Sequence, residues 1–314
     1  MYANVRGMKG KRTGITEILQ QHEPHIFLIA ETQLRSDLTV SFVGYTCFHR
    51  KREGKVGGGV GILIRNDFRF NIAPHISDRS IEMMWISVFR KDDVPLTVGV
   101  YYGRQESTSR AEIEQEMTLL NEEIEEMKNE GEILIAMDGN ARLGLLGESI
   151  SRNGKLLTEV FTKTDLYLIN NSDKCRGKVT RRNTQNDSEF SAIDFVLSSE
   201  GAKSWVKDMQ IDEEGLIRVK GKNSTDHNTI IIKLSIHGTN QPKRIKRTMW
   251  NIKAPDAQWA AFSKELSKHN QKAKAIITNP LENIDTKYRK WRRELENAAR
   301  RIRCQSFASY PFEN

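Results

Sequence analysis

The chain has 314 residues, 49 Lys+Arg against 41 Asp+Glu, and 38% hydrophobic residues, which is a globular composition. Its three cysteines lie far apart without a C-x-x-C pair, which argues against a zinc site and a disulfide framework. No apolar run approaches the roughly 20 residues that cross a bilayer, and the opening MYANVRGMKGKR lacks the apolar stretch of a secretory signal. We therefore expect an intracellular protein, nuclear or cytoplasmic, without a membrane partner.

The net charge of +8 is unevenly distributed. Residues 236–314 hold 17 Lys+Arg and 7 Asp+Glu, whereas residues 1–235 hold 32 and 34. The polar run GTNQPKRIKR lies at the junction. These features predict two parts, a near-neutral domain over residues 1–236 and a basic helical tail over residues 237–314, and a basic tail favours a polyanionic partner.

The pattern of apolar residues predicts the elements in chain order. A first helix is expected over Ile15–His22, and a second carries an apolar face from Ile113 to Met127 with glutamates on its other face. Helical spacing returns in the tail at residues 259–266 and 288–302. Short apolar runs bounded by Gly, Asn, Asp or charge predict strands at Ile26–Ala30, Val60–Ile64, Met84–Phe89, Leu96–Tyr102, Ile133–Met137, Leu166–Ile169, Ala192–Leu197 and Thr229–Leu234.

Several of these strands follow one another directly between residues 59 and 102, without a helix between them. That succession disfavours a purely parallel, doubly wound sheet. We expect an α/β fold with mixed sheets, or two sheets packed together, and helices outside.

Isolated polar residues stand at the ends of these strands, where a hydrophobic core would not place them. One such residue is ordinarily a helix cap or a turn former. Together they offer oxygen ligands without thiols, a set that favours Mg²⁺ or Mn²⁺ over zinc and that suits a phosphate substrate. The residues are Asn4, Glu31, Asp138, Asn140, Asp194, Asp226 and His227.

The order and spacing of these segments resemble the endonuclease/exonuclease/phosphatase superfamily. The resemblance spans about residues 1–235, and it implies a DNase I-like four-layer α/β sandwich of two packed mixed sheets flanked by helices. Each block is weak alone, but seven occur in order: NVRG, AETQL, GGGVGILI, VYYG, MDGNA, SAIDF and STDHNTI.

Within that superfamily the chain is most similar to the endonuclease domain of non-LTR retrotransposons, of the type that resembles apurinic endonucleases. RNGKLL at residues 152–157 and TRRN at residues 180–183 favour this subgroup. The tail, with TMWNIKAPDAQW and SFASYP, resembles the segment that joins endonuclease to reverse transcriptase in such polyproteins.

The resemblance implies roles for individual residues. Glu31 would be the main Mg²⁺ ligand, with Asn4 and Asp226 adjacent to the ion. Asp138 would orient or deprotonate the attacking water, and Asn140 would hold both the water and a phosphate oxygen. His227, held as a cation by Asp194, would contact the scissile phosphate. Tyr101 would bond to the phosphate or the leaving oxygen, although Tyr102 follows it directly and the choice between the two stays open. The reaction implied is hydrolytic nicking of DNA that leaves 3′-hydroxyl and 5′-phosphate ends.

Basic residues beside the motif loops are ordinarily solvated, but at this location they are also candidates to bind DNA phosphates. The chain has Arg104 where the superfamily commonly has Asn. The candidates for nucleic-acid binding are Lys51, Arg52, Arg104, Arg152, Thr180 and Arg181. The basic tail is a candidate to bind RNA.

Two alternatives keep the fold but change the function. One is a phosphatase that acts on inositol phosphates or lipids. The other is a catalytically inactive remnant that only binds nucleic acid. The retention of all seven polar residues at strand ends favours an active enzyme.

Overall fold

The structure is a computed structural model. The chain divides into two compact units, Met1–Gly238 and Thr239–Asn314, each described by itself. The boundary predicted from the polar linker lies two residues earlier. The description covers residues 1–35, 40–52, 57–68, 71–76, 79–89, 95–183, 189–219, 225–235, 247–250, 256–268, 270–278, 287, 290, 291 and 305–308.

A seven-stranded sheet forms one half of the first unit, with the strand order β10-β14-β15-β1-β2-β4-β3. β1 runs parallel to β2 and β10 parallel to β14, whereas the other neighbouring strands are antiparallel. The strands are β1 (Tyr2–Asn4), β2 (Ile26–Ala30), β3 (Tyr45–Arg50), β4 (Val60–Arg65), β10 (Cys175–Arg176), β14 (Val206–Ile211) and β15 (Ile230–Leu234).

A six-stranded sheet forms the other half, in the order β5-β6-β7-β8-β13-β9. Its only parallel pair is β7 with β8, so this sheet is mixed as well. The strands are β5 (Asn71–Ile76), β6 (Met83–Phe89), β7 (Leu96–Tyr102), β8 (Glu132–Asp138), β9 (Tyr167–Leu168) and β13 (Asp194–Ser198).

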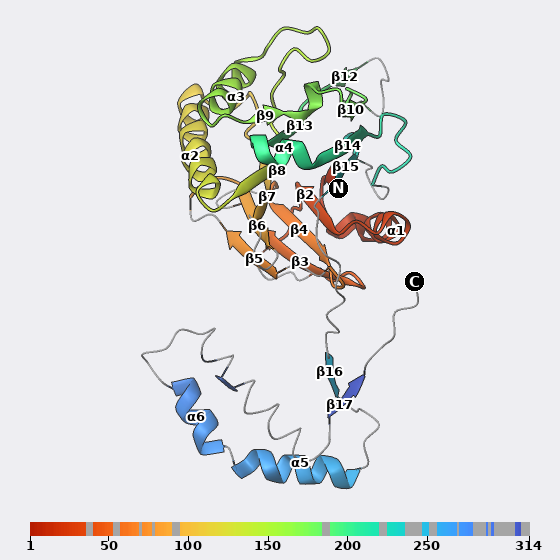
Figure 1. The fold of residues 1–314 in the computed structure, drawn as a ribbon, viewed down its shortest axis with the longest axis vertical. Coiled ribbons are helices and arrows are strands. Elements are labelled where there is room, and N and C mark those ends of the chain that lie inside the picture. Colours follow the sequence, from red (N-terminus) through yellow and green to blue (C-terminus); the bar gives the residue numbers. More distant parts are fainter. Residues whose placement is uncertain are drawn as a thin grey trace. The chain divides into compact units, whose positions relative to one another are not determined.

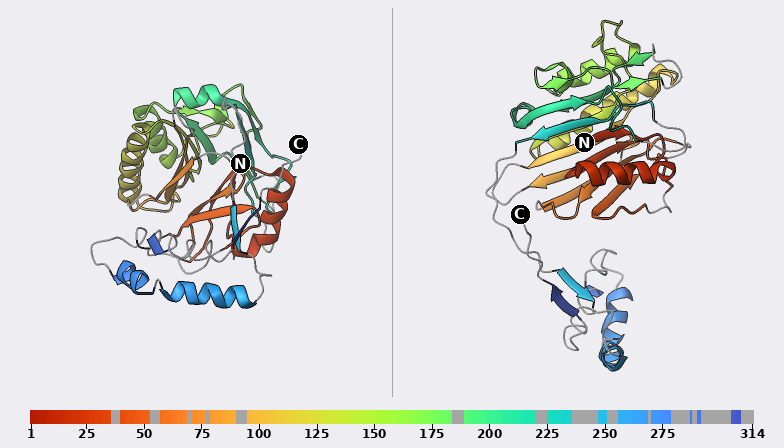
Figure 2. Two further views of the ribbon diagram at one scale, coloured as in Figure 1. Left: turned by 60° about the horizontal axis from the view of Figure 1, so that its bottom comes forward. Right: turned by 90° about the vertical axis from the view of Figure 1, so that its right-hand side faces the viewer.

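Helices cover the outer faces of both sheets (Figures 1 and 2). Helix α1 (Arg12–His22) packs Ile15 and Ile18 against Phe27 of the larger sheet. Helices α2 (Arg110–Lys128) and α3 (Arg152–Lys163) pack against the smaller sheet, and the inner faces of the two sheets share a third core. The remaining elements are η1 (Lys9–Lys11), η2 (Ile169–Asn171), α4 (Glu200–Trp205), β11 (Arg181–Arg182) and β12 (Phe190–Ser191).

This architecture confirms the predicted four-layer sandwich of two mixed sheets. The apolar runs predict the central strands well, but they do not predict β3, β5 and β14. β3 is half-buried or exposed along its length, β5 contains Pro74 at a sheet edge, and β14 alternates buried and exposed residues with charges between them. A continuous apolar run indicates a strand that is buried on both faces, and it does not reveal strands with one exposed face.

The acidic helix α2 differs from the sequence prediction in one respect. Ser109 caps its first turn by accepting the amide hydrogen of Glu112, and most of its glutamates face solvent as expected. Glu116 and Glu123, however, are buried, with 5% and 3% of their surface exposed. Each accepts hydrogen bonds from groups of the smaller sheet or its loops, which satisfies the buried carboxylates. The glutamates are therefore not confined to the solvent face.

The second unit contains an antiparallel strand pair and two helices. β16 (Arg247–Trp250) pairs with β17 (Gln305–Ala308), and α5 (Asp256–Lys268) is followed by α6 (Asn270–Thr278). On α5 the rings of Trp259 and Phe262 meet edge to face, with centroids 6.0 Å apart. The helix expected over residues 288–302 lies outside the described residues except at positions 290 and 291. Among the described helices, none has the length and apolar character needed to span a bilayer.

A glycine in the smaller sheet allows Trp85, the largest fully buried side chain among the described residues, to reach across to α2. Trp85 of β6 stands opposite Gly99 of β7, and a Cβ atom at Gly99 would lie 2.5 Å from the Trp85 ring. The indole Nε1 donates a hydrogen bond to Glu123 at 3.1 Å, so the ring cannot move aside without losing this bond.

We therefore expect Gly99→Ala to lower the free energy of unfolding by about 1–3 kcal/mol, because the added methyl group overpacks a fixed ring. Urea unfolding of the full chain measures the effect. Gly10→Ala is the matched control, since a Cβ atom there meets nothing within 4 Å. Equal stability of the two variants would contradict this account of the Trp85 packing.

Candidate active site

Strand register brings three polar side chains together at one end of the smaller sheet. Asp138 ends β8, where it pairs with Tyr102 of β7 on one side and with Asp194 of β13 on the other. Residues paired across adjacent strands project from the same face. All three therefore lie on the face that meets the larger sheet, and all three are buried.

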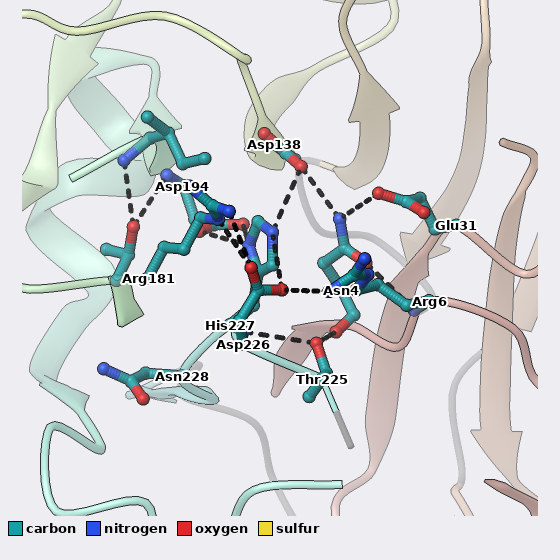
Figure 3. Close-up of polar contacts among 12 residues, drawn as sticks. Asn4, Arg6, Glu31, Asp138, Arg181, Asp194, Thr225, Asp226, His227 and Asn228 are labelled. Atoms are coloured by element: carbon teal, nitrogen blue, oxygen red, sulfur yellow. Dashed lines mark hydrogen bonds and ion pairs between the residues drawn. The ribbon is translucent and has the colours of Figure 1, made fainter. Parts of the chain in front are cut away.

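The larger sheet supplies the opposite side of the site. Asn4 ends β1, and its Nδ2 donates to Glu31 Oε1 at 2.9 Å and to Asp138 Oδ2 at 2.8 Å, which joins the two carboxylates (Figure 3). Glu31 directly follows β2. Thr225 donates to the carbonyl group of Asn4 at 2.7 Å and accepts the amide hydrogen of His227, so the loop before β15 is fixed to the end of β1.

His227 lies between carboxylates and is itself only 4% exposed. Its Nδ1 is 2.8 Å from Asp194 Oδ2, and its Nε2 is 3.8 Å from Asp138 Oδ2. Burial works against a charge on the ring, but Asp194, Asp138 and Asp226 outweigh it and raise the pKa of His227 to about 9. His227 is thus an imidazolium ion at neutral pH.

The surroundings of Asp138 favour its neutral form, whereas those of His227 favour its charged form. Burial and the neighbouring Asp194 raise the pKa of Asp138 to about 7, although His227 and a hydrogen bond from the Asn140 amide act against the shift. A carboxyl group with this pKa exchanges protons readily near neutral pH. That property suits a general base or acid.

Asp194 is held from three directions and is fully buried. Its carboxylate accepts the Tyr2 hydroxyl group at 2.9 Å, in addition to His227. Its amide group donates to the Thr180 hydroxyl at 3.0 Å, and its carbonyl group accepts from Asn170 at 3.1 Å. These bonds fix the carboxylate that orients the imidazolium ring.

Asp226 has a different set of partners. Its Oδ1 is 3.1 Å from Arg6 Nη1, and its Oδ2 is 2.8 Å from both Nε and Nη2 of Arg181. Burial alone would raise the pKa of Asp226, but His227 and the two arginines hold it below its usual value. Asp226 is therefore a carboxylate at neutral pH, with an arginine on each oxygen.

The residues fit a hard divalent cation in part. Asp138, Asp194 and His227 offer atoms within 4.8 Å of one another, close enough to hold a metal ion. Nδ1 of His227 already bonds to Asp194, however. These two residues are therefore better described as an ion pair with Asp138 beside it than as a metal site. Glu31 is the partly exposed carboxylate beside it and is the better ligand for Mg²⁺. The oxygen of Asn4 accepts the amide hydrogen of Arg6 at 3.0 Å, so in this orientation Asn4 positions Glu31 rather than binding a cation.

The structure corrects the choice of tyrosine. Tyr101 pairs with Met137, on the face of the smaller sheet that packs under α2, and its hydroxyl group donates to Glu116 at 2.6 Å. Tyr101 is therefore no part of the cluster. Tyr102 faces it: Asn140 hydrogen-bonds the Tyr102 hydroxyl, and the guanidinium group of Arg52 lies 5.3 Å from the ring centroid.

Several site residues adopt a left-handed backbone conformation that costs free energy for residues other than glycine. Arg6, Glu31, Gln33 and Asn140 have φ angles of 44°, 52°, 50° and 44°. Such residues persist where the surrounding structure enforces them, and they gather at functional sites. Two of the four, Glu31 and Asn140, were predicted as site residues from the sequence.

The six candidates for nucleic-acid binding differ in accessibility. Thr180 is fully buried and accepts the amide hydrogens of Ile193 and Asp194, so its predicted contact with nucleic acid is wrong. Arg181 is part of the site, with 43% of its side chain exposed, and Lys51 is exposed. The other three are held by protein groups: Arg52 by Glu82, Arg104 by Glu116, and Arg152 by the carbonyl groups of Glu106 and Thr108.

Sequence reasoning missed Tyr2 and Arg6. A signal for Tyr2 was available, because alternate residues of a strand share a face and Tyr2 stands two positions before Asn4. Arg6 follows Asn4 by two residues within the NVRG block. Its position beside Asp226 depends on a contact 220 residues away in the sequence, which no local pattern reveals.

Comparisons with known proteins agree with this geometry. The sequence profile of the Endonuclease/Exonuclease/phosphatase family matches residues 1–137. A comparison with curated protein sequences gave no match.

Solved structures share the fold at low identity. The endonuclease domain of TRAS1, a telomere-specific non-LTR retrotransposon, is 16% identical with a TM-score of 0.56, over 74% of this chain and 95% of that chain. The AP endonuclease LMAP from Leishmania major is 11% identical with a TM-score of 0.59, over 74% and 85%. The 3′ phosphatase NExo from Neisseria, bound to a product DNA hairpin, is 17% identical with a TM-score of 0.57, over 75% and 98%.

The profile match covers the strands that carry Asn4 and Glu31 and ends one residue before Asp138. Residues 1–137 of this chain are therefore similar in sequence to the Endonuclease/Exonuclease/phosphatase family, and the named structures share its fold over 74–75% of the chain.

Proposed function

We propose that this protein is a Mg²⁺-dependent endonuclease that hydrolyses DNA phosphodiester bonds by nicking, and that it derives from a non-LTR retroelement. One observation carries the proposal: a buried imidazolium, His227, stands beside Asp138, a carboxyl group with a pKa of about 7. A phosphodiesterase that works without a covalent intermediate needs this combination of a base for water and a fixed cation for the phosphate.

Asp138 is the base in this proposal. Its Oδ1 accepts the Asn140 amide hydrogen at 2.9 Å and its Oδ2 accepts Asn4 Nδ2, so the carboxylate is fixed in place. In the ionised form it removes a proton from the attacking water. Asn140 is fixed as well, because its Nδ2 donates to the Gly103 carbonyl group at 2.9 Å.

His227 stabilises the negative charge that grows on the phosphate oxygens during attack. Asp194 orients the ring and keeps it protonated, as the resemblance implies. Tyr102 is a neutral donor beside it, because burial and the nearby carboxylates of Glu31 and Asp138 raise its pKa above the usual value for a phenol. A divalent cation held by Glu31 would supply further positive charge to the same oxygens.

DNA is the substrate that the surroundings favour. The structural neighbours include a retrotransposon endonuclease domain, an AP endonuclease and a phosphatase solved with a DNA hairpin. Arg6, Arg181 and Lys51 present exposed cationic groups on or near the site loops. The retroelement origin rests on RNGKLL and TRRN, and the +10 tail supports a second contact with nucleic acid, RNA included.

The nicking reaction gives the first test of this proposal. We expect the full-length protein with Mg²⁺ to convert supercoiled plasmid to open circles, and EDTA to abolish the conversion. Asp138→Ala removes the base and lowers the rate by about 10²–10⁴-fold. Asp208→Ala, on β14 in an ion pair with Arg176, is the matched control and retains the wild-type rate.

Wild-type protein that produces no more open circles than Asp138→Ala would refute the nuclease assignment. If that protein instead releases inorganic phosphate from a phosphomonoester, the phosphatase alternative replaces it. Binding of DNA without either reaction would support the inactive remnant.

The two adjacent tyrosines give a second prediction. Tyr102→Phe removes a donor to the transition state, and we expect the nicking rate to fall by about 10²-fold. Tyr101→Phe leaves the rate unchanged but lowers the free energy of unfolding by about 1 kcal/mol, because it removes a buried hydrogen bond to Glu116. Plasmid nicking and urea unfolding of both variants separate the roles, and a reversed order of the two rates would restore Tyr101 to the site.

A further inference from the structure

Two arginines, one next to the larger sheet and one on the two-stranded β11–β12 sheet, converge on one carboxylate. Arg6 follows β1 and Arg181 begins β11. Arg6 Nη1 lies 3.1 Å from Asp226 Oδ1, and Arg181 Nη2 lies 2.8 Å from Asp226 Oδ2, on the other side of the carboxylate (Figure 3). The side chains are 52% and 43% exposed. Each guanidinium carries five N–H donors, more than its contact with Asp226 uses.

The backbone at Arg6 is held in its unusual conformation by a buried lysine. Lys11 is only 2% exposed, and its Nζ donates to the carbonyl groups of Val5 and Arg6, the latter at 2.7 Å. The Arg6 amide donates to Asn4 Oδ1 at 3.0 Å. These bonds fix both sides of a residue with φ of 44°, so the direction in which Arg6 leaves the backbone is imposed.

Arg181 is fixed by the loop that carries His227. Arg181 and His227 form an isolated antiparallel bridge, and the Arg182 amide donates to the Asp226 carbonyl group at 2.8 Å. The Thr180 carbonyl group accepts the Asn228 amide hydrogen at 2.7 Å. Arg181 is therefore attached to the same segment as the imidazolium that faces the scissile phosphate.

We propose that Arg6 and Arg181 form a clamp for a nucleic acid backbone phosphate beside the scissile one, an inference that rests on the proposed function. Paired arginines bind a phosphate by presenting N–H donors and positive charge to its oxygens. Arg6 and Arg181 present the same arrangement to the two oxygens of Asp226. Asp226 lies next to His227, with 3.9 Å between Oδ1 and Nε2, so a phosphate at the exposed sides of the two arginines adjoins the site of cleavage. The clamp contacts no base. It fixes the position of the nucleic acid strand along the site.

The test measures DNA binding by the full-length protein in EDTA, where no cleavage is expected. A labelled DNA duplex is titrated over a salt series from about 50 to 200 mM. For Arg6→Gln and for Arg181→Gln we expect weaker binding, with the slope of log K against log salt reduced in magnitude by about 0.9 each. Arg176→Gln, which removes a comparable arginine from the Arg176–Asp208 ion pair at the sheet edge, keeps the wild-type slope.

A thermodynamic cycle separates binding from mere neutralisation of Asp226. If the arginines served only to cancel that charge, Arg6→Gln would have no effect in an Asp226→Asn background. The clamp predicts that the loss of slope persists there. Arg6→Lys keeps the charge but not the planar fork, so we expect it to preserve the slope and to recover only part of the affinity.

The outcomes distinguish this proposal from the function on which it rests. A wild-type protein that neither nicks nor binds DNA refutes the nuclease assignment. A wild-type protein that does both, with arginine variants that bind with unchanged affinity and slope, refutes the clamp alone. An effect of Arg6→Gln that vanishes in the Asp226→Asn background also refutes it.

Discussion

Two buried carboxylates, Asp138 and Asp194, stand side by side in the first unit, and the imidazolium ring of His227 offsets the repulsion between them. The register of β8 and β13 places Asp138 directly opposite Asp194, where two negative charges without water would repel each other strongly. His227 enters from the loop before β15 and bonds to Asp194 at 2.8 Å. The two sheets are thereby joined at the site by charge, while apolar side chains hold them together elsewhere.

This arrangement divides the chemistry between the two carboxylates. The carboxylate of Asp194 accepts hydrogen bonds from the Tyr2 hydroxyl group and from His227 Nδ1, so it stabilises the imidazolium ion. Asp138, which Asn4 and the Asn140 amide hold but do not neutralise, keeps a pKa of about 7 and can exchange a proton. Their hydrogen-bond partners thus give different roles to two chemically identical groups.

Much of this could be predicted from the sequence, because short apolar runs mark strands buried on both faces and because polar residues at their ends are conspicuous. Hydrogen bonds and ion pairs place all seven predicted residues at or beside the cluster: Asn4, Glu31, Asp138, Asn140, Asp194, Asp226 and His227. The choice between Tyr101 and Tyr102 could not be made, since it depends on which face of β7 meets the second sheet. The inward turn of Glu116 and the pairing of Arg6 with Asp226 depend on partners far away in the sequence, which periodicity does not encode.

The shortest strand of the larger sheet has a consequence for the order of assembly. β1 has three residues, and it alone joins the half formed by β2, β4 and β3 to the half formed by β15, β14 and β10. Its partner Ile230 is made long after Tyr2 during synthesis. Pairing of residues so far apart in the sequence requires closure of a long loop, which slows folding. The nascent chain therefore has neither a complete larger sheet nor an assembled site until β15 has been synthesised.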